Sequence, residues 1–406
     1  MKILQVNCVY NKGSTGKIMY DIHTGLIENQ IDSVICYGRG AKTTDKNVYK
    51  TCGELYSKLN NLMARITGLM YGGCFFSTNK LISIIKKEKP DIVHLHCING
   101  YFVNIYRLVS WLNKNKVKTV LTLHAEFMHT ANCGYALECE KWKSGCGKCP
   151  RLKKETKSIL FDRTADSFKK MKKAFEGFEN VIAVSVSPWL MERAKLSPIM
   201  EKLEHAVVLN GLNTEVFHTY NTDDLREKYG LTGKKVVFHA TSGFSTDKNH
   251  IKGGYYLIEL AKLLPNVEFL IAGNRENIDV PPNVRLLGML SNQEELAKHY
   301  AMADLTVIAS KKETFSMITA ESLCCGTPVV GFKAGGPESI TIEDYSSLVD
   351  YGDLESLCKA TKDFLDKEFD KEQISNLAKD KYSKINMANN YLEIYKKLYE
   401  REDKKC

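Results

Sequence analysis

The residues best suited to chemistry lie between Lys311 and Ile340, where Glu313 and Glu321 stand with seven residues between them. Glu313 precedes a predicted helix over 316–325, and Glu321 lies within it. The first backbone N–H groups of a helix have no intrahelical partner, and with the helix dipole they favour an anion such as a phosphate. A carboxylate repels a phosphate but accepts hydrogen bonds from hydroxyl groups. The spacing therefore indicates a ligand whose phosphates lie between hydroxyl-bearing rings.

An alternation of strands and helices must position these two carboxylates. Apolar runs predict buried strands over 305–309 and 328–332, and Gly326 ends the helix between them. Gly335 and Gly336 then open another helix. Ligands of open α/β sheets bind beyond the carboxyl ends of the strands, so the loop after the first strand is the expected ligand site.

The E-x7-E pattern, followed by G-T-P-V-V and G-G-x-E, resembles the donor site of the family-4 retaining glycosyltransferases. The resemblance implies metal-independent transfer of a hexosyl group from a nucleoside diphosphate sugar with retention at the anomeric carbon. It implies that Glu313 orients the donor sugar and that Glu321 binds the ribose. The amides near Phe315, Ser316 and Met317 would then lie at the phosphates.

The same resemblance assigns roles along the rest of the chain. His124, which ends a predicted strand over 119–123, is implied to contact the donor sugar, and Lys252, before Gly253, the donor phosphates. The family's arginine that precedes this lysine is missing, and Lys248 is the candidate replacement. Further donor-binding candidates are Gly16, Ser242, Lys248, Arg275 and Met289, and acceptor-binding candidates are Asn99 and Tyr101.

Strands and helices alternate through most of the chain, which predicts parallel sheets covered on both faces. With the resemblance, the expected fold is α/β: two doubly wound Rossmann-like domains facing across a cleft, the glycosyltransferase-B fold. The expected domains are an acceptor-side half over 1–204, a nucleotide-sugar-binding half over 205–385 and a helix over 386–406 that crosses back to the first.

The composition favours a cytoplasmic protein. The 406 residues are 44% hydrophobic, and no apolar run is long enough to span a bilayer. The start, M-K-I-L-Q-V-N-C, is too short and too soon polar for a signal peptide. A net charge of +9 favours anionic partners such as nucleotides or acidic lipids. No nucleic-acid partner is expected.

Four of the thirteen cysteines cluster within 133–149. Cys146 and Cys149 form a C-x2-C knuckle that suits thiolate ligation of zinc, and Cys133 and Cys139 precede it at wider spacing. Two disulfides or four free thiols are the alternatives. A subgroup of family-4 enzymes from bacterial polysaccharide clusters has a similar segment, which implies a structural insertion. A structural zinc is therefore expected, and no cofactor is expected for catalysis, because no D-x-D motif stands beside a strand.

Two segments combine apolar and basic residues. Residues 151–175 carry nine basic and three acidic side chains, punctuated by apolar ones, and a basic amphipathic helix can lie on an anionic membrane. A solvated helix on the first domain is the alternative. The helices predicted over 54–88 are interpreted as a core-facing pair, although their apolar side chains also make them a candidate for peripheral contact with the inner face of the cell membrane.

The expected function is synthesis of a bacterial surface polysaccharide, such as capsule, exopolysaccharide or O-antigen, with a saccharide or lipid-linked saccharide as acceptor. Two alternatives stay open. One is a nucleotide-sugar epimerase or phosphorylase on the same fold, because a fold does not fix the chemistry. The other is a non-catalytic partner or nucleic-acid binder that uses the basic surface and the cysteine cluster.

Overall fold

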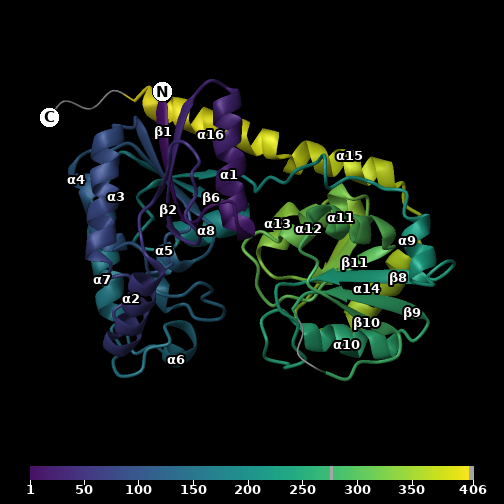
Figure 1. Ribbon diagram of the computed structural model, residues 1–406. Coiled ribbons are helices and arrows are strands. Elements are labelled where there is room, and N and C mark those ends of the chain that lie inside the picture. Colours follow the sequence, from purple (N-terminus) through teal and green to yellow (C-terminus); the bar gives the residue numbers. More distant parts are fainter. Residues whose placement is uncertain (275–277, 402–406) are drawn as a thin grey trace. The chain divides into compact units, whose positions relative to one another are not determined.

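The computed structural model describes residues 1–274 and 278–401 (Figure 1). Arg275, a predicted donor contact, lies outside the described residues. The chain divides into two compact units: the first comprises Met1–Leu209 and Met387–Cys406, and the second comprises Asn210–Asn386. The first unit extends beyond residue 204 because the strand Glu204–Val207 completes its sheet.

The first unit is built on a parallel sheet whose strand order is β3-β2-β1-β4-β5-β6-β7. Its central strands are short apolar runs that are buried along almost their whole length, as expected for a sheet covered on both faces. The strands are β1 (Lys2–Val9), β2 (Asp32–Arg39), β3 (Val48–Lys50), β4 (Ile92–Leu95), β5 (Thr119–Leu123), β6 (Val181–Ser185) and β7 (Glu204–Val207).

Helices cover both faces of the first sheet. Side chains of α1 and α16 share one apolar core with the strands, and Figure 1 shows α3, α4 and α7 on the side of the sheet opposite to α1. The helices are α1 (Gly13–Glu28), α2 (Glu54–Thr67), α3 (Phe75–Glu88), α4 (Ile105–Lys114), α5 (Phe127–Thr130), η1 (Lys141–Lys143), α6 (Leu152–Glu155), α7 (Thr164–Phe175), α8 (Pro188–Lys195) and α16 (Lys384–Tyr399).

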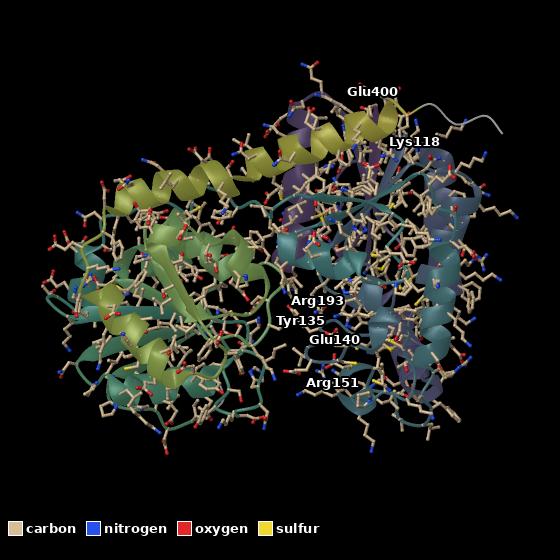
Figure 2. All side chains as sticks on the ribbon, turned by 180° about the vertical axis from the view of Figure 1, so that it is seen from behind. Lys118, Tyr135, Glu140, Arg151, Arg193 and Glu400 are labelled. Atoms are coloured by element: carbon tan, nitrogen blue, oxygen red, sulfur yellow. The ribbon has the colours of Figure 1, made fainter. Side chains whose placement is uncertain are left out.

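The last helix is fixed to the first unit at both its middle and its end. Tyr391 and Tyr395 of α16 are fully buried, and their hydroxyl groups bond Thr122 and His94. Beside Glu400, Lys118 Nζ donates to the carbonyl oxygen of Tyr399 at 2.8 Å (Figure 2).

The second unit has a parallel sheet with the order β10-β9-β8-β11-β12-β13. Helices α10 and α14 pack with the sheet around one apolar core. The elements are α9 (Asp223–Lys228), β8 (Lys235–Ala240), α10 (Gly254–Leu263), β9 (Val267–Ala272), β10 (Val284–Gly288), α11 (Gln293–Met302), β11 (Leu305–Ile308), α12 (Met317–Cys324), β12 (Val329–Phe332), α13 (Gly336–Ile340), η2 (Glu343–Tyr345), β13 (Ser346–Val349), α14 (Leu354–Leu365) and α15 (Lys371–Tyr382).

Each sheet therefore has the predicted doubly wound form, with one point at which the strand order reverses. In the first unit this point lies between β1 and β4, and in the second between β8 and β11. In such sheets ligands bind outside the carboxyl ends of the strands at the reversal point. The loops after β8 and β11 hold Lys252 and Glu313, so both fall at the reversal point of the second sheet.

Two expectations about helices in the first unit need correction. The core-facing interpretation of 54–88 is wrong for α2 and the start of α3, where Leu59, Met63 and Phe76 are exposed. In contrast, Phe168 and Met171 of α7 are buried, because α7 packs its apolar face against the rest of the unit. The apolar side chains of α7 are thus unavailable to a membrane.

Candidate functional site

An ion pair joins the two loops at the reversal point of the second sheet. Lys252 Nζ lies 2.7 Å from Glu313 Oε1, although the residues are 61 positions apart. Both side chains are mostly shielded, with 25% of Lys252 and 12% of Glu313 exposed. The structure therefore brings together two of the three residues predicted to be catalytic, within a single unit.

Glycines allow the loop of Lys252 to lie directly against the loop of Glu313. Gly253 has a φ of +67°, and a Cβ there would lie 1.9 Å from the carbonyl oxygen of Ala309. The amide of Lys311 donates to the carbonyl of Ile251 at 2.8 Å, which closes the contact between the loops. Only glycine combines this backbone conformation with so close an approach.

The G-G-x-E motif holds the loop of Glu313 from the other side. Glu313 N donates to Ala334, and the amide of Gly336 donates to the carbonyl of Glu313 at 2.8 Å. A Cβ on Gly336 would lie 2.5 Å from the carbonyl carbon of Thr314. Glu338 accepts from the amides of the turn that precedes it, so its carboxylate has a structural role.

The start of α12 forms an anion-compatible turn next to this pair. Ser316 has a φ of +83°, a left-handed conformation that is uncommon for a residue with a side chain. Its Oγ accepts from the amide of Thr319, 3.4 Å away, and caps the helix. The first amides of the helix, beginning with that of Met317, have no carbonyl partner within the helix. Phe315 is buried and anchors the turn.

Glu321 lies on α12 and is held by a residue that the sequence analysis did not identify. The hydroxyl of Tyr300 donates to Glu321 Oε2 at 3.0 Å. Tyr300 is completely buried, and burial together with this carboxylate raises the pKa of the phenol. Tyr300 therefore stays a hydrogen-bond donor at ordinary pH and fixes the orientation of Glu321.

The other predicted donor residues of the second unit are exposed. Ser242 lies in the loop after β8, and Met289 follows β10 with about half of its surface accessible. The ammonium of Lys248 lies 5.5 Å from the ring centre of Tyr255, a cation–π contact. Lys248 is thus held on the aromatic ring instead of forming an ion pair with Glu313.

In the first unit, two histidines follow adjacent strands and meet. His96 Nδ1 and His124 Nε2 are 3.3 Å apart, and His96 Nε2 lies 3.0 Å from the side-chain oxygen of Gln5. Burial lowers the pKa of His124 to about 4. His124 is therefore a neutral imidazole at pH 7, suited to hydrogen bonding and not to a positive charge.

The remaining predicted residues of the first unit lie on neighbouring loops. Gly16 lies inside the first turn of α1 and not in the loop before it, because the helix begins at Gly13. Asn99 accepts a hydrogen bond from the thiol of Cys97. Tyr101 contacts Met70 and has a φ of +55°. Both acceptor candidates follow β4, beside the reversal point of the first sheet.

A buried carboxylate that the sequence analysis missed fastens the cysteine-rich segment to the first unit. Glu126 is fully buried, pairs with Arg193 at 2.5 Å and accepts from the amide of Ala136. Burial opposes its ionisation, but His129, Arg193 and this amide outweigh burial and hold the pKa of Glu126 below its ordinary value. The Arg193 guanidinium lies 4.8 Å from the Trp142 ring centre (Figure 2 labels Arg193).

The four clustered cysteines line one cavity of about 20 Å³. All twelve cysteines in the described ranges are free thiols, and these ranges contain no group of three or more ligands arranged to hold a metal. Burial raises the pKa of the Cys146 thiol to about 11 and also raises the pKa of Cys133 and Cys149. The four cysteine thiols around the cavity are ligands that suit zinc. Zinc binding stays a prediction.

Comparison with known families identifies both units. The model of "glycosyl transferases group 1" matches residues 221–381, which are most of the second unit, and the model of "glycosyl transferase 4-like" matches residues 59–137 of the first. The second unit is a group 1 glycosyltransferase domain. The chain is a glycosyltransferase with the glycosyltransferase-B fold.

Two curated relatives cover most of the chain. A predicted colanic acid biosynthesis glycosyl transferase of Escherichia coli strain K12, WcaC, is 23% identical over 81% of this chain and 82% of its own length. An uncharacterized 41.2 kDa protein of the cps region of Klebsiella pneumoniae is 24% identical over 91% of this chain and 93% of its own.

Solved structures share the fold at low sequence identity. The sucrose-phosphate synthase of Thermosynechococcus elongatus has a TM-score of 0.69 at 15% identity, over 98% of this chain and 99% of that one. HepE of Anabaena, solved in complex with UDP-glucose, has a TM-score of 0.63 at 15% identity, over 98% of this chain and 100% of that one.

Proposed function

We propose that this glycosyltransferase moves a hexosyl group from a nucleoside diphosphate sugar to a saccharide or lipid-linked saccharide, with retention, during synthesis of a bacterial surface polysaccharide. The observation that carries the proposal is the Lys252–Glu313 pair at the reversal point of the second sheet, beside the start of α12. The UDP-glucose in HepE and the colanic acid and cps relatives support the donor and the product class.

Lys252 is proposed to exchange partners when the donor binds. In the structure its ammonium pairs with Glu313. A diphosphate placed at the first turn of α12 offers the ammonium more negative charge than a single carboxylate does. Lys252 and the amides of Phe315, Ser316 and Met317 would then stabilise the charge that builds on the leaving diphosphate, which is the main electrostatic task of the reaction.

Release from Lys252 would free Glu313 for its proposed role. Its backbone is fixed on both sides by the contacts with Ala334 and Gly336, so its carboxylate is pre-oriented. A carboxylate accepts hydrogen bonds from two sugar hydroxyls and holds the ring in place during transfer. Glu321, oriented by Tyr300, is proposed to accept from the ribose hydroxyls in the same manner.

His124 is proposed to act through hydrogen bonding to the donor sugar, as the resemblance implies. Its low pKa of about 4 leaves it uncharged at pH 7, and His96 fixes one ring nitrogen. A retaining reaction through two displacements would require an enzymic nucleophile. The proposed route is instead attack of the acceptor on the same face of the sugar from which the diphosphate leaves.

Product analysis with and without acceptor tests the proposal. The chain should release nucleoside diphosphate and form an α-linked product from an α-linked donor only when an acceptor is present. Conversion of the donor to another nucleotide-sugar without acceptor would instead favour the epimerase alternative. Donor binding with no product for any saccharide or lipid-linked acceptor would favour a binding protein.

A further inference from the structure

Large apolar side chains are exposed on three stretches of the first unit. Helix α2 turns one face outward, because its apolar residues recur at helical spacing while only Ser57 and Ala64 of the helix are buried. The exposed fraction reaches 83% for Leu55 and 79% for Phe76. We call the following set the apolar surface: Leu55, Leu59, Leu62, Met63, Phe75, Phe76, Ile159, Leu160 and Phe161.

These stretches adjoin one another around α2. The rings of Tyr56 and Phe76 are 6.1 Å apart, which joins the first half of α2 to the start of α3. The amide of Ile159 donates to the carbonyl of Arg65 at 2.7 Å, which joins the end of α2 to 159–161. Contiguous exposed apolar surfaces of this kind mark sites of interaction with proteins or membranes.

A basic groove borders the apolar surface. A hollow of about 680 Å³ is lined by residues of α4, α7 and the segment that leads into α3, and Phe75 belongs to both features. No carboxylate lines it among the described residues. Its charged side chains are all cationic: Arg107, Lys114, Lys170 and Lys173.

Exposed lysines also stand close in sequence to the residues of the apolar surface. Lys58, Lys153 and Lys157 are exposed, and none forms a salt bridge with a described carboxylate. The nearby acids are engaged, since Glu54 pairs with Arg39 and Glu155 pairs with Arg151 (Figure 2 labels Arg151). Asp162, which follows Phe161, accepts from the amides of Cys149 and Thr164. Exposed lysines and the cations of the groove therefore outnumber the unpaired carboxylates near the apolar surface.

We propose that this face docks the first unit on an anionic lipid bilayer, with the apolar surface in the interfacial layer and the groove against lipid phosphates. Apolar side chains ringed by lysines and arginines are the pattern that binds anionic interfaces. A second copy of the chain fits less well, because a symmetric contact would place two basic rims against each other. Among the described residues no helix has the length and apolar content to cross a bilayer, so the contact is peripheral.

This surface differs from the amphipathic segment expected from the sequence. The apolar side chains of α7 are buried, so α7 adds only its lysines to the proposed membrane-binding face, where they line the groove. The exposed apolar side chains of this face come instead from α2, the start of α3 and 159–161. The inference does not rest on the proposed transfer reaction, because vesicle binding requires neither donor nor acceptor.

Co-sedimentation of the full chain with vesicles tests this inference. Vesicles of equal parts phosphatidylglycerol and phosphatidylcholine should bind the chain, the binding should weaken as salt rises, and vesicles of phosphatidylcholine alone should bind far less. The triple variant Leu59→Ser, Met63→Ser, Phe76→Ser should bind the mixed vesicles at least about tenfold more weakly. The matched control Leu263→Ser, Leu377→Ser removes exposed leucines from the second unit and should bind unchanged.

A charge variant tests the groove separately. Lys170→Gln with Lys173→Gln should weaken binding by about tenfold or more, since each basic group near an anionic surface contributes roughly fivefold. The control Lys359→Gln with Lys362→Gln makes the same charge change on α14 and should have little effect. Circular dichroism must show all variants folded. Absence of binding by the unaltered chain, equal binding by the triple variant, or self-association lost in the triple variant would overturn the proposal.

Discussion

Replacing Glu313 with glutamine should separate catalysis from nucleotide binding. In the structure Glu313 holds the ammonium of Lys252 at 2.7 Å, and this contact must break before the lysine can reach a diphosphate. Glutamine keeps the shape but removes the competing charge. Ion pairs in contact with solvent are typically worth about 0–1 kcal/mol. Removing this competing pair should therefore let the Glu313→Gln variant bind UDP equally well or about fivefold more tightly.

Turnover should move in the opposite direction. If Glu313 accepts hydroxyl hydrogen bonds from the donor sugar, the variant loses charge-assisted bonds worth about 1.5–3 kcal/mol. Each 1.4 kcal/mol is roughly a tenfold change in rate, so kcat should fall about ten- to a hundredfold. The matched change Lys252→Met should reduce both turnover and UDP affinity, because it removes the group proposed to bind the phosphates.

Isothermal titration with UDP, or with whichever nucleoside diphosphate binds, and a product-formation assay measure the two effects on the same preparations. The reasoning fails if Glu313→Gln loses as much nucleotide affinity as Lys252→Met does. It also fails if Glu313→Gln keeps full turnover. Either result would mean that the pair is a structural contact with no part in handling the donor.

Four further predictions follow from other contacts. Glu321→Gln, unlike Glu313→Gln, should weaken binding of the bare nucleotide about tenfold in a titration, because the ribose contact serves the free nucleotide as well as the donor. Equal nucleotide affinity of the two variants would contradict the assignment of the ribose to Glu321 and the sugar to Glu313. Gly253→Ala should destabilise the chain by about 3 kcal/mol or more in urea unfolding, because the added Cβ would meet Ala309. The matched control is Gly233→Ala, which has a similar φ of +73° but open space around it and should cost only about 1 kcal/mol. Glu126→Gln should lower the free energy of unfolding by about 3 kcal/mol, because it leaves Arg193 without its counter-charge, while the exposed control Glu192→Gln should be nearly neutral. Because the pKa of Glu126 lies below its ordinary 4.5, its contribution to stability is present above pH 4.5 and is lost as the pH falls through the lowered pKa. The stabilities of the unaltered chain and of Glu126→Gln should therefore converge in acid. Turnover should survive EDTA treatment that leaves the fold intact, and absolute dependence on added magnesium or manganese would refute this. Elemental analysis should find about one zinc per chain, which is lost on replacing Cys146 and Cys149 with serine. A zinc-free native protein would refute the zinc site.

Much of the second unit could be predicted from local sequence. The strands around β11 and β12, the helix α12 and its start at Ser316 followed from apolar runs and glycine positions, and the structure places them within one or two residues of the expected bounds. The edge strands β3 and β13 were not identified. Their residues are only half-buried, so they lack the apolar runs that mark central strands.

Contacts between distant residues could not be predicted from the sequence. Tyr300 is an unremarkable helix residue until the fold sets it against Glu321, and Glu126 is one acid among many until it is buried beside Arg193. The outward face of α2 is a different case. Periodicity shows which residues share a face of a helix, but it does not show whether another element covers that face. Here no element in the described part of the chain covers Leu55 or Leu59.

The most direct test of the central claim is a thermal-shift panel of UDP-, GDP-, ADP- and dTDP-sugars on the unaltered chain and on Lys252→Met. A ligand at a hundred times its dissociation constant stabilises the folded chain by about 2.7 kcal/mol. We expect one nucleotide class to raise the melting temperature of the unaltered chain and to lose most of that effect in the variant. Stabilisation by none of the nucleotide-sugars, or an equal shift in Lys252→Met, would contradict a donor site at the start of α12.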